Sequence, residues 1–323
     1  MKPRRIELET GLDVGTVNAY FFPSPEPVLI DTGLKSAEGY QTIVRTLAEY
    51  GLTIADLSRV VITHPHVDHC GLAGRIVAES EATVWIYEAG QPWLVDFPRL
   101  WAERTGFYRD HFLHKLGLPV LAEQLIVGYM THIVQQTDSV PAERLVAFGL
   151  DVPLNLGGLA WQVLHTPGHA NMMTCFYQPE TRQFLSADML LPKTPTPVVE
   201  QPQPGQPRTP SLPVYLDSLA RVEQLDIEWV YPGHGDPFTN HRQLIAHQRG
   251  RIQQRKHQCR ELVGAGTNTV AAIVDAMYAD YPPQMRFTAL WMVVGYLDLL
   301  KQEGAVVEQE IEGVWQYFQA GNE

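Results

Sequence analysis

The sequence predicts an α/β fold that carries a helical insertion and a small C-terminal domain. Short apolar runs with strand character, such as residues 59–63, alternate with amphipathic helical patterns such as residues 40–51, and this alternation is typical of layered α/β proteins. Residues 88–145 interrupt the alternation with a mostly helical segment that is rich in aromatic side chains. From about residue 264 the pattern changes again, to two helices followed by a hairpin.

Length and composition narrow the class of protein. A chain of 323 residues is too long for one ordinary core, and the change of pattern divides it into residues 1–263 and 264–323. The net charge of −12 disfavours a general nucleic-acid or membrane surface, and no apolar run is long enough to span a bilayer. Three widely spaced cysteines, Cys70, Cys175 and Cys259, fit a reduced cytoplasmic location.

The densest cluster of chemically active residues is a loop of metal-ligand types. His64, His66, Asp68 and His69 follow the predicted strand at residues 59–63. Imidazole nitrogens and carboxylate oxygens suit zinc and similar divalent ions. His64 and His66 can point one way while Asp68 and His69 diverge, so this one loop could supply two adjacent metals.

Three further motifs complete a recognisable pattern. His169 closes Thr166-Pro167-Gly168-His169, Asp188 ends the strand-like run Phe184-Leu185-Ser186-Ala187, and His234 lies in Pro232-Gly233-His234-Gly235. Together with the first loop, and in this order, the motifs resemble those of the metallo-β-lactamase superfamily. The resemblance covers roughly residues 8 to 240 and implies a four-layered αββα sandwich.

The resemblance also implies a set of metal ligands and a mechanism. It assigns the first metal to His64, His66 and His169. It assigns the second metal to Asp68, His69 and His234, and the position between the two metals to Asp188. Two divalent ions are expected, with Zn²⁺ ahead of Mn²⁺ or Fe, and a hydroxide between them would attack a carbonyl or phosphoryl centre. Asp68 would be the catalytic residue that carries a proton to the leaving group.

Two residues near the loop have two interpretations each. Asp31 follows the strand at residues 27–30 and is either a turn residue or a carboxylate that orients a metal-bound histidine. Cys70 either approaches the metals or packs behind the loop as a small buried residue.

Three segments outside the motifs also remain open. Residues 88–145 form either an apolar lid over the site or a self-packed insertion, and the proline-rich residues 192–213 either rim the pocket or leave it. Residues 240–263 form a basic helix with Asn240 as its N-cap, and its cations lie either on a solvated face or along a track for an anionic substrate. Three histidines of this region, His241, His247 and His257, lack partner motifs and are predicted to be at the surface.

The C-terminal residues 264–323 resemble the winged-helix module of one branch of the superfamily, which includes β-lactamase-like endoribonucleases. A helix that reads DNA should carry Lys and Arg, whereas residues 287–300 are apolar or neutral except for Asp298. We therefore expect this module to serve packing or homo-oligomerisation, and expect no DNA partner.

The leading prediction is a dinuclear hydrolase of a small ester, lactone or thioester. The second is a metal-dependent phosphodiesterase or endoribonuclease, which the basic helix supports and the acidic charge opposes; an RNA partner is therefore not favoured. A mono-iron persulfide dioxygenase is a third interpretation, and the full set of seven ligands argues against it. Ala170-Asn171-Met172-Met173 after the second motif weakens a glyoxalase II assignment.

Overall fold

The computed structural model describes residues 2–11, 15–193, 195–199, 201, 207–281 and 283–321. Its first sheet contains six strands in sequence order, antiparallel from β1 to β3 and parallel from β3 to β6. The strands are β1 (Arg4–Leu8), β2 (Val17–Phe22), β3 (Val28–Ile30), β4 (Arg59–Ile62), β5 (Thr83–Tyr87) and β6 (Leu145–Phe148).

The second sheet faces the first and has the order β11-β10-β9-β8-β7. Its strands are β7 (Leu154–Leu156), β8 (Leu159–His165), β9 (Thr174–Gln178), β10 (Gln183–Ala187) and β11 (Trp229–Pro232). All its neighbours are antiparallel except β10 and β11, which are parallel. A buried cluster between the sheets takes side chains from both, including Phe22 and Val61 from the first and Trp161 and Phe176 from the second.

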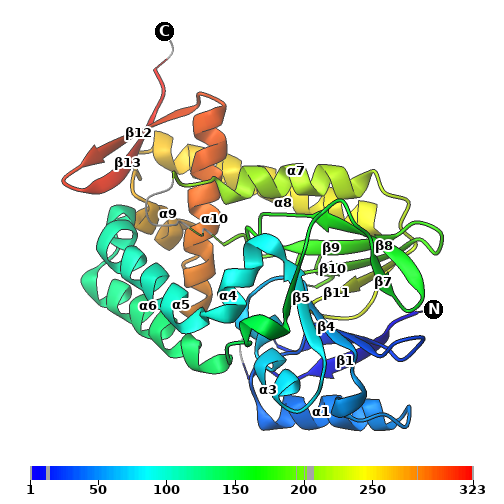
Figure 1. Cartoon of the computed structure of the whole chain (residues 1–323). Coiled ribbons are helices and arrows are strands. Elements are labelled where there is room, and N and C mark those ends of the chain that lie inside the picture. Colours follow the sequence, from blue (N-terminus) through cyan, green and yellow to red (C-terminus); the bar gives the residue numbers. More distant parts are fainter. Residues whose placement is uncertain are drawn as a thin grey trace.

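Helices cover both outer faces of this pair of sheets (Figure 1). On the first sheet lie α1 (Ala37–Ala48) and α3 (Ala73–Ala78), whose apolar faces pack on β1 to β5. On the second sheet lie α7 (Ser211–Glu223) and α8 (His241–Gly264). The predicted four-layered αββα sandwich is therefore confirmed.

The segment between β5 and β6 is helical, as predicted. It contains α4 (Gln91–Val95), α5 (Phe97–Phe107) and α6 (Val120–Ile133), joined by short helical turns. Aromatic side chains hold it together, with the rings of Phe97 and Trp101 stacked at 5.4 Å between centroids. The segment lies beside the sandwich and against the C-terminal module (Figure 1).

The C-terminal module is a winged helix, with α9 (Val270–Met277), α10 (Pro283–Gln302) and the hairpin of β12 (Val306–Ile311) and β13 (Val314–Gln319). The Thr269 side chain caps α9, and Glu312-Gly313 forms the predicted turn with positive φ at both residues. Helix α10 packs on α7, α8 and α9. Gly295 permits this contact, because a Cβ there would lie 2.5 Å from the Cβ of Leu212 on α7.

One of two predictions at the start of α8 is wrong. Asn240 occupies the N-cap position, as predicted, although its side chain makes no capping bond and its amide instead donates to Gln243. His241, predicted to be at the surface, is buried, and this burial lowers its pKa. Within the part of the chain that the structure describes, no helix has both the length and the apolarity needed to cross a bilayer.

Candidate metal centre

Most of the predicted ligands lie on loops that leave the carboxyl ends of neighbouring parallel strands. Strands β3 and β4 are parallel neighbours, and Asp31 follows the first while the His64 loop follows the second. In the opposite sheet, β10 and β11 are also parallel neighbours, and they lead to Asp188 and His234. The loop after β8 supplies His169. Because such ends meet at one edge, residues far apart in the sequence become neighbours.

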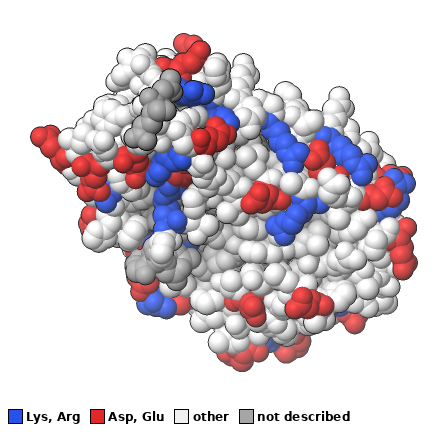
Figure 2. Space-filling view, turned by 90° about the horizontal axis from the view of Figure 1, so that it is seen from above, with Lys and Arg blue, Asp and Glu red and all other residues white. Residues whose placement is uncertain are grey.

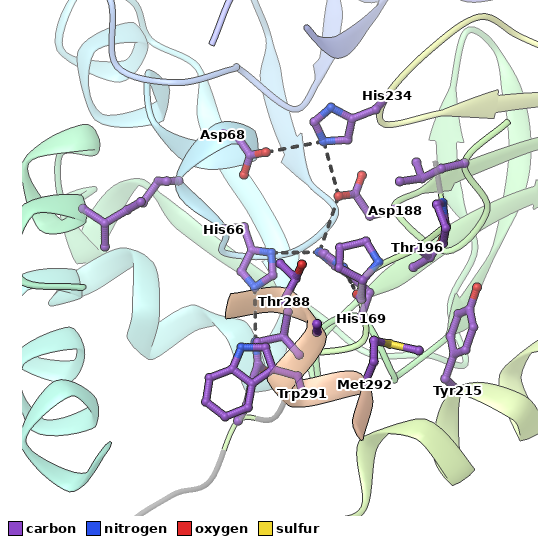
Figure 3. Close-up of a pocket in the computed structure, with 18 of the residues that line it drawn as sticks. His66, Asp68, His169, Asp188, Thr196, Tyr215, His234, Thr288, Trp291 and Met292 are labelled. Atoms are coloured by element: carbon purple, nitrogen blue, oxygen red, sulfur yellow. Dashed lines mark hydrogen bonds and ion pairs between the residues drawn. The ribbon is translucent and has the colours of Figure 1, made fainter. Parts of the chain in front are cut away.

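The structure brings all seven predicted ligands together at this edge. Figure 3 labels those that line the cavity, namely His66, Asp68, His169, Asp188 and His234. Their ligand atoms fall into three groups, each within 4.8 Å, namely His64, His66 and His169; His64, His69 and Asp188; and Asp68, His69 and His234. The first and third groups match the two sets inferred from the resemblance. Asp188 lies between them, because its Oδ2 is 3.4 Å from Nε2 of both His169 and His234.

The nitrogens of the first group converge on one point. Nδ1 of His66 lies 3.0 Å from Nε2 of His64 and 2.9 Å from Nε2 of His169. Three acceptor nitrogens so close together have little reason to converge unless a cation lies among them.

Most of these histidines are oriented through the ring nitrogen that faces away from the centre. Nδ1 of His69 donates to Asp31 Oδ2 at 2.8 Å, Nδ1 of His169 donates to the Pro197 carbonyl at 2.7 Å, and Nδ1 of His234 donates to the Thr16 carbonyl at 2.7 Å. Nδ1 of His64 lies 3.0 Å from Oγ1 of Thr63. With the proton on Nδ1, the lone pair of Nε2 faces the centre in each ring, as metal-bound histidines require.

Asp31 is thus an orienting carboxylate and not merely a turn residue. Its Oδ1 accepts from the backbone N–H of Thr63, and its Oδ2 accepts from the Thr63 hydroxyl as well as from His69, each at 2.8 Å. Cys70 packs behind the loop, where its sulfur contacts the Thr137 hydroxyl, and burial raises the pKa of the thiol to about 12.

Burial keeps the first set of histidines neutral. It lowers the pKa of His66 to about 3, assisted by the neighbouring His169. Burial also lowers the pKa values of His64 and His169. All three are therefore neutral imidazoles, the form that binds a metal ion.

The second set combines histidines with carboxylates. Burial opposes charge on His234, but Asp188 and Asp68 raise its pKa to about 10. The pKa of His69 is raised in the same way by Asp188, Asp68 and Asp31, against its burial. Burial raises the pKa values of both Asp68 and Asp188, yet the two histidines outweigh it and lower them. These carboxylates therefore need positive charge, which divalent ions would supply with release of the histidine protons.

Two buried atoms at the centre make no hydrogen bond among the described residues, and they test whether the site fits a metal. Nε2 of His69 and Oδ1 of Asp188 are fully buried and lie 3.3 Å apart as an ion pair, yet neither makes a hydrogen bond. Burying polar atoms without hydrogen bonds is costly. Both atoms belong to the predicted ligands and face the centre, so the donor set fits a bound metal ion.

The Pro232-Gly233-His234 turn permits a close approach to this centre. A Cβ on Gly233 would lie 2.0 Å from Oδ1 of Asp188 and 3.0 Å from Cε1 of His69. No side chain can occupy that space, so glycine is required if Asp188 is to keep its position.

A cavity of about 460 Å³ opens onto the centre. It reaches His66, Asp68, His169, Asp188 and His234 at one end, and its walls are mostly apolar and aromatic. This volume is typical of sites for small molecules.

The three segments that the sequence left open, namely the helical insertion, the proline-rich loop and the basic helix α8, border this cavity together with α10 of the C-terminal module. The helical insertion contributes Trp101, Arg104, Tyr108, Tyr129, Met130 and Ile133, and the proline-rich loop contributes Pro195, Thr196, Pro197, Val199 and Gln201. Helix α10 of the winged helix contributes Thr288, Ala289, Trp291, Met292 and Tyr296, some of which lie beside His66 and His169 in Figure 3. The insertion and the loop therefore border the site.

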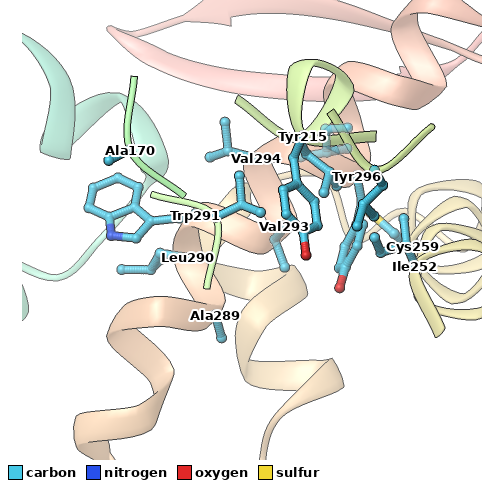
Figure 4. Packing of buried hydrophobic residues seen from close by; sticks show 14 of the residues in the cluster. Ala170, Tyr215, Ile252, Cys259, Ala289, Leu290, Trp291, Val293, Val294 and Tyr296 are labelled. Carbon is cyan, nitrogen blue, oxygen red and sulfur yellow. The ribbon is translucent and has the colours of Figure 1, made fainter. Parts of the chain in front are cut away.

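Sequence reasoning missed several of these wall residues. Gln201 is buried and its amide lies 3.2 Å from Nε2 of His66, yet it stands in a loop without a periodic pattern. Trp291 was predicted only as part of an apolar helix, whereas it borders both the cavity and the core (Figure 4). Only the apolar character of residues 287–300 could have suggested that α10 is buried.

Comparison with known proteins agrees with this architecture. The model of the metallo-beta-lactamase superfamily matches residues 12–234, and that of the beta-lactamase associated winged helix domain matches residues 269–315. The chain is 27% identical to the probable metallo-hydrolase YqjP of Bacillus subtilis over 317 residues, covering 97% of this chain and 96% of that protein.

Two other similarities are informative. An atrochrysone carboxyl ACP thioesterase of Aspergillus fumigatus is 25% identical over 281 residues, which cover 83% of this chain and 70% of that one. A metallo-beta-lactamase family protein of Thermus thermophilus shares the fold over 98% of both chains, with a TM-score of 0.80 at 24% identity. The chain belongs to the metallo-β-lactamase superfamily and is a metallo-hydrolase with a C-terminal winged-helix domain.

Proposed function

We propose that the protein is a dinuclear, zinc-dependent hydrolase of a small ester, lactone or thioester. The observation that carries this proposal is the largely apolar cavity of about 460 Å³ that ends at the seven ligands. A thioesterase among the relatives supports the carbonyl chemistry. Three buried cysteines without disulfides support a reduced, cytoplasmic location.

In this proposal the two metal sites are the two ligand groups described above, with Asp188 between them. Two bound divalent ions would lower the pKa of water between them and polarise the substrate carbonyl. The imidazole and carboxylate ligands suit Zn²⁺, although Mn²⁺ and Fe remain compatible with the same donors.

The protein's own groups would do three further things. Asp31 and the carbonyls of Thr16 and Pro197 fix the tautomers of His69, His234 and His169, so no reorientation is needed during turnover. Asp68, which is partly exposed and faces the cavity, is placed to carry a proton to the leaving group. The aromatic walls would exclude water from the acyl part of the substrate.

Several basic residues of α8 already have partners within the protein, which favours a small substrate over nucleic acid. Arg249 pairs with Glu223, Lys256 pairs with Glu303, and Arg242 donates to backbone carbonyls at the end of α7 and just after it. Figure 2 shows positive and negative side chains interspersed over much of the face above the sandwich. The burial of α10 also opposes a DNA partner, because a winged helix would use such a helix for the major groove.

The test is turnover of acyl-thioesters, lactones and a single-stranded RNA by the zinc-loaded protein, with His169→Ala as control and metal content measured in parallel. Turnover of a carbonyl substrate that His169→Ala abolishes, with two zinc ions per wild-type chain, would support the proposal. Cleavage of RNA alone would contradict it. One zinc ion per active chain would contradict its dinuclear part.

A further inference from the structure

The cavity carries an unusual distribution of charge. Apart from the ligand cluster, the charged side chains among its described lining residues are two arginines, Arg104 and Arg251. The chain as a whole has a net charge of −12. Beyond the metal centre, the charged side chains of the cavity are therefore all positive, although the protein as a whole is acidic. Such a cavity attracts an anionic ligand.

Arg104 is the more informative of the two. It lies on α5, its side chain is only 7% exposed, and its Nη2 atom is buried without a hydrogen-bond partner. No acidic residue that the structure describes forms an ion pair with it. Arginines are almost never fully buried unless they are paired, because removing the charge from water is costly.

The protein holds this guanidinium in place through aromatic rings. It stacks over Trp93 at 3.9 Å from the ring centroid and lies 5.7 Å from that of Trp101. These contacts fix the position of the group but do not satisfy its N–H donors. Burial lowers the pKa of Arg104 to about 10, so it stays charged at neutral pH.

Other donors in the cavity are also available. Arg251 on α8 is partly buried, and its charge acts on Tyr278 and Tyr296, which also line the cavity. No described residue forms an ion pair with it. Nε2 of Gln248, one turn earlier on α8, is buried without a partner among the described residues, although its Oε1 accepts from Tyr215. The available groups are thus donors, so the complementary ligand is rich in acceptors.

We infer that the substrate of this hydrolase carries an oxyanion, either a carboxylate or a phosphate, which Arg104 binds through its guanidinium inside the cavity. This inference rests on the proposed function and narrows its substrate class. A planar guanidinium pairs with either group through parallel N–H bonds, and the pairing would satisfy the buried Nη2 atom. The scissile carbonyl would lie at the metal centre while the anion lies at α5.

The experiment compares matched substrates on the zinc-loaded protein. Succinyl, glutaryl and adipyl thioesters of N-acetylcysteamine are compared with uncharged acyl thioesters of equal length, and acyl-CoA is compared with the same acyl group on N-acetylcysteamine. The first arm places a carboxylate on the acyl side, and the second places phosphates on the leaving group. In at least one arm kcat/KM should favour the charged substrate.

Arg104→Met should reduce that charged-to-neutral ratio by about 30-fold, which corresponds to about 2 kcal/mol at about 1.4 kcal/mol per factor of ten. Arg104→Lys should restore part of it. The control is Arg99→Met on the same helix, because Arg99 is exposed and pairs with Asp96 and Glu103. A ratio near unity in the wild type, or the same ratio in Arg104→Met, would overturn the inference.

Two further measurements separate this inference from its alternatives. A purely structural Arg104 predicts that Arg104→Met lowers the melting temperature, whereas a group kept for ligand binding predicts a higher one, since an unpaired buried charge is removed. If no ester or thioester is turned over, the proposed function fails. Glutarate and inorganic phosphate then test the inference without turnover. A larger rise in the melting temperature of the zinc-loaded wild type than of Arg104→Met would support it, and an equal rise would overturn it.

Discussion

Replacing Asp31 with Asn should weaken metal binding without disturbing the fold. Asn is close in shape to Asp, and it tolerates the left-handed backbone at this position, where φ is +58°. The amide oxygen would keep the bond from the Thr63 backbone N–H, which leaves the NH₂ group facing Nδ1 of His69. Two donors cannot bond, so the neutral ring would have to move its proton to Nε2, the atom that faces the metals.

The expected loss follows from that change of tautomer. Removing such an orienting partner typically weakens metal affinity by about 10- to 100-fold, or about 1.4–2.7 kcal/mol. The assay is competition for zinc against a chromophoric chelator, with the melting temperature of the metal-free proteins as a check on folding. Asp226→Asn is the control, since that aspartate is exposed and pairs with Arg182. Zinc affinity equal to the wild type in Asp31→Asn would refute the orienting role.

Two further predictions concern the centre and the cavity wall. Gly233→Ala should leave a folded protein with little bound zinc, because the new Cβ would lie 2.0 Å from Oδ1 of Asp188 and would displace that carboxylate. Metal analysis after gel filtration checks this, and full zinc occupancy would contradict it. Trp291→Ala should lower the free energy of unfolding by about 3–5 kcal/mol, because the ring is 2% exposed and packs against Tyr108 and Phe112. Urea unfolding measures this, and a loss below about 1 kcal/mol would place the ring outside the core.

The layers and the ligand cluster could be predicted because their signals are local. Each ligand motif follows a short apolar strand, and strand ends meet where the topology brings them together. The role of Asp31 could not be decided, because its partner His69 comes from another strand end and only the folded chain shows the contact.

The cavity walls could not be predicted for a related reason. Arg104 stands in a helix beside other charged residues, and its sequence does not distinguish a buried guanidinium from a solvated one such as Arg99. The prediction for His241 failed for the same reason, because the residues next to it in the sequence do not show what packs against the start of α8. Burial of individual polar residues depends on which elements meet, and that information lies outside the local pattern.

Because α10 forms part of the cavity wall, the metal ligands and this part of the wall come from separate stretches of the chain. The metal ligands end at His234, whereas the wall formed by Trp291 and Met292 comes from a separate, later stretch. Recombination or drift in that stretch could change which molecules enter without altering the reaction itself. Chimaeras that exchange residues 265–321 between relatives should therefore exchange substrate preference while retaining zinc content. The winged helix would then be an exchangeable part of the cavity wall, beside the insertion that carries Arg104.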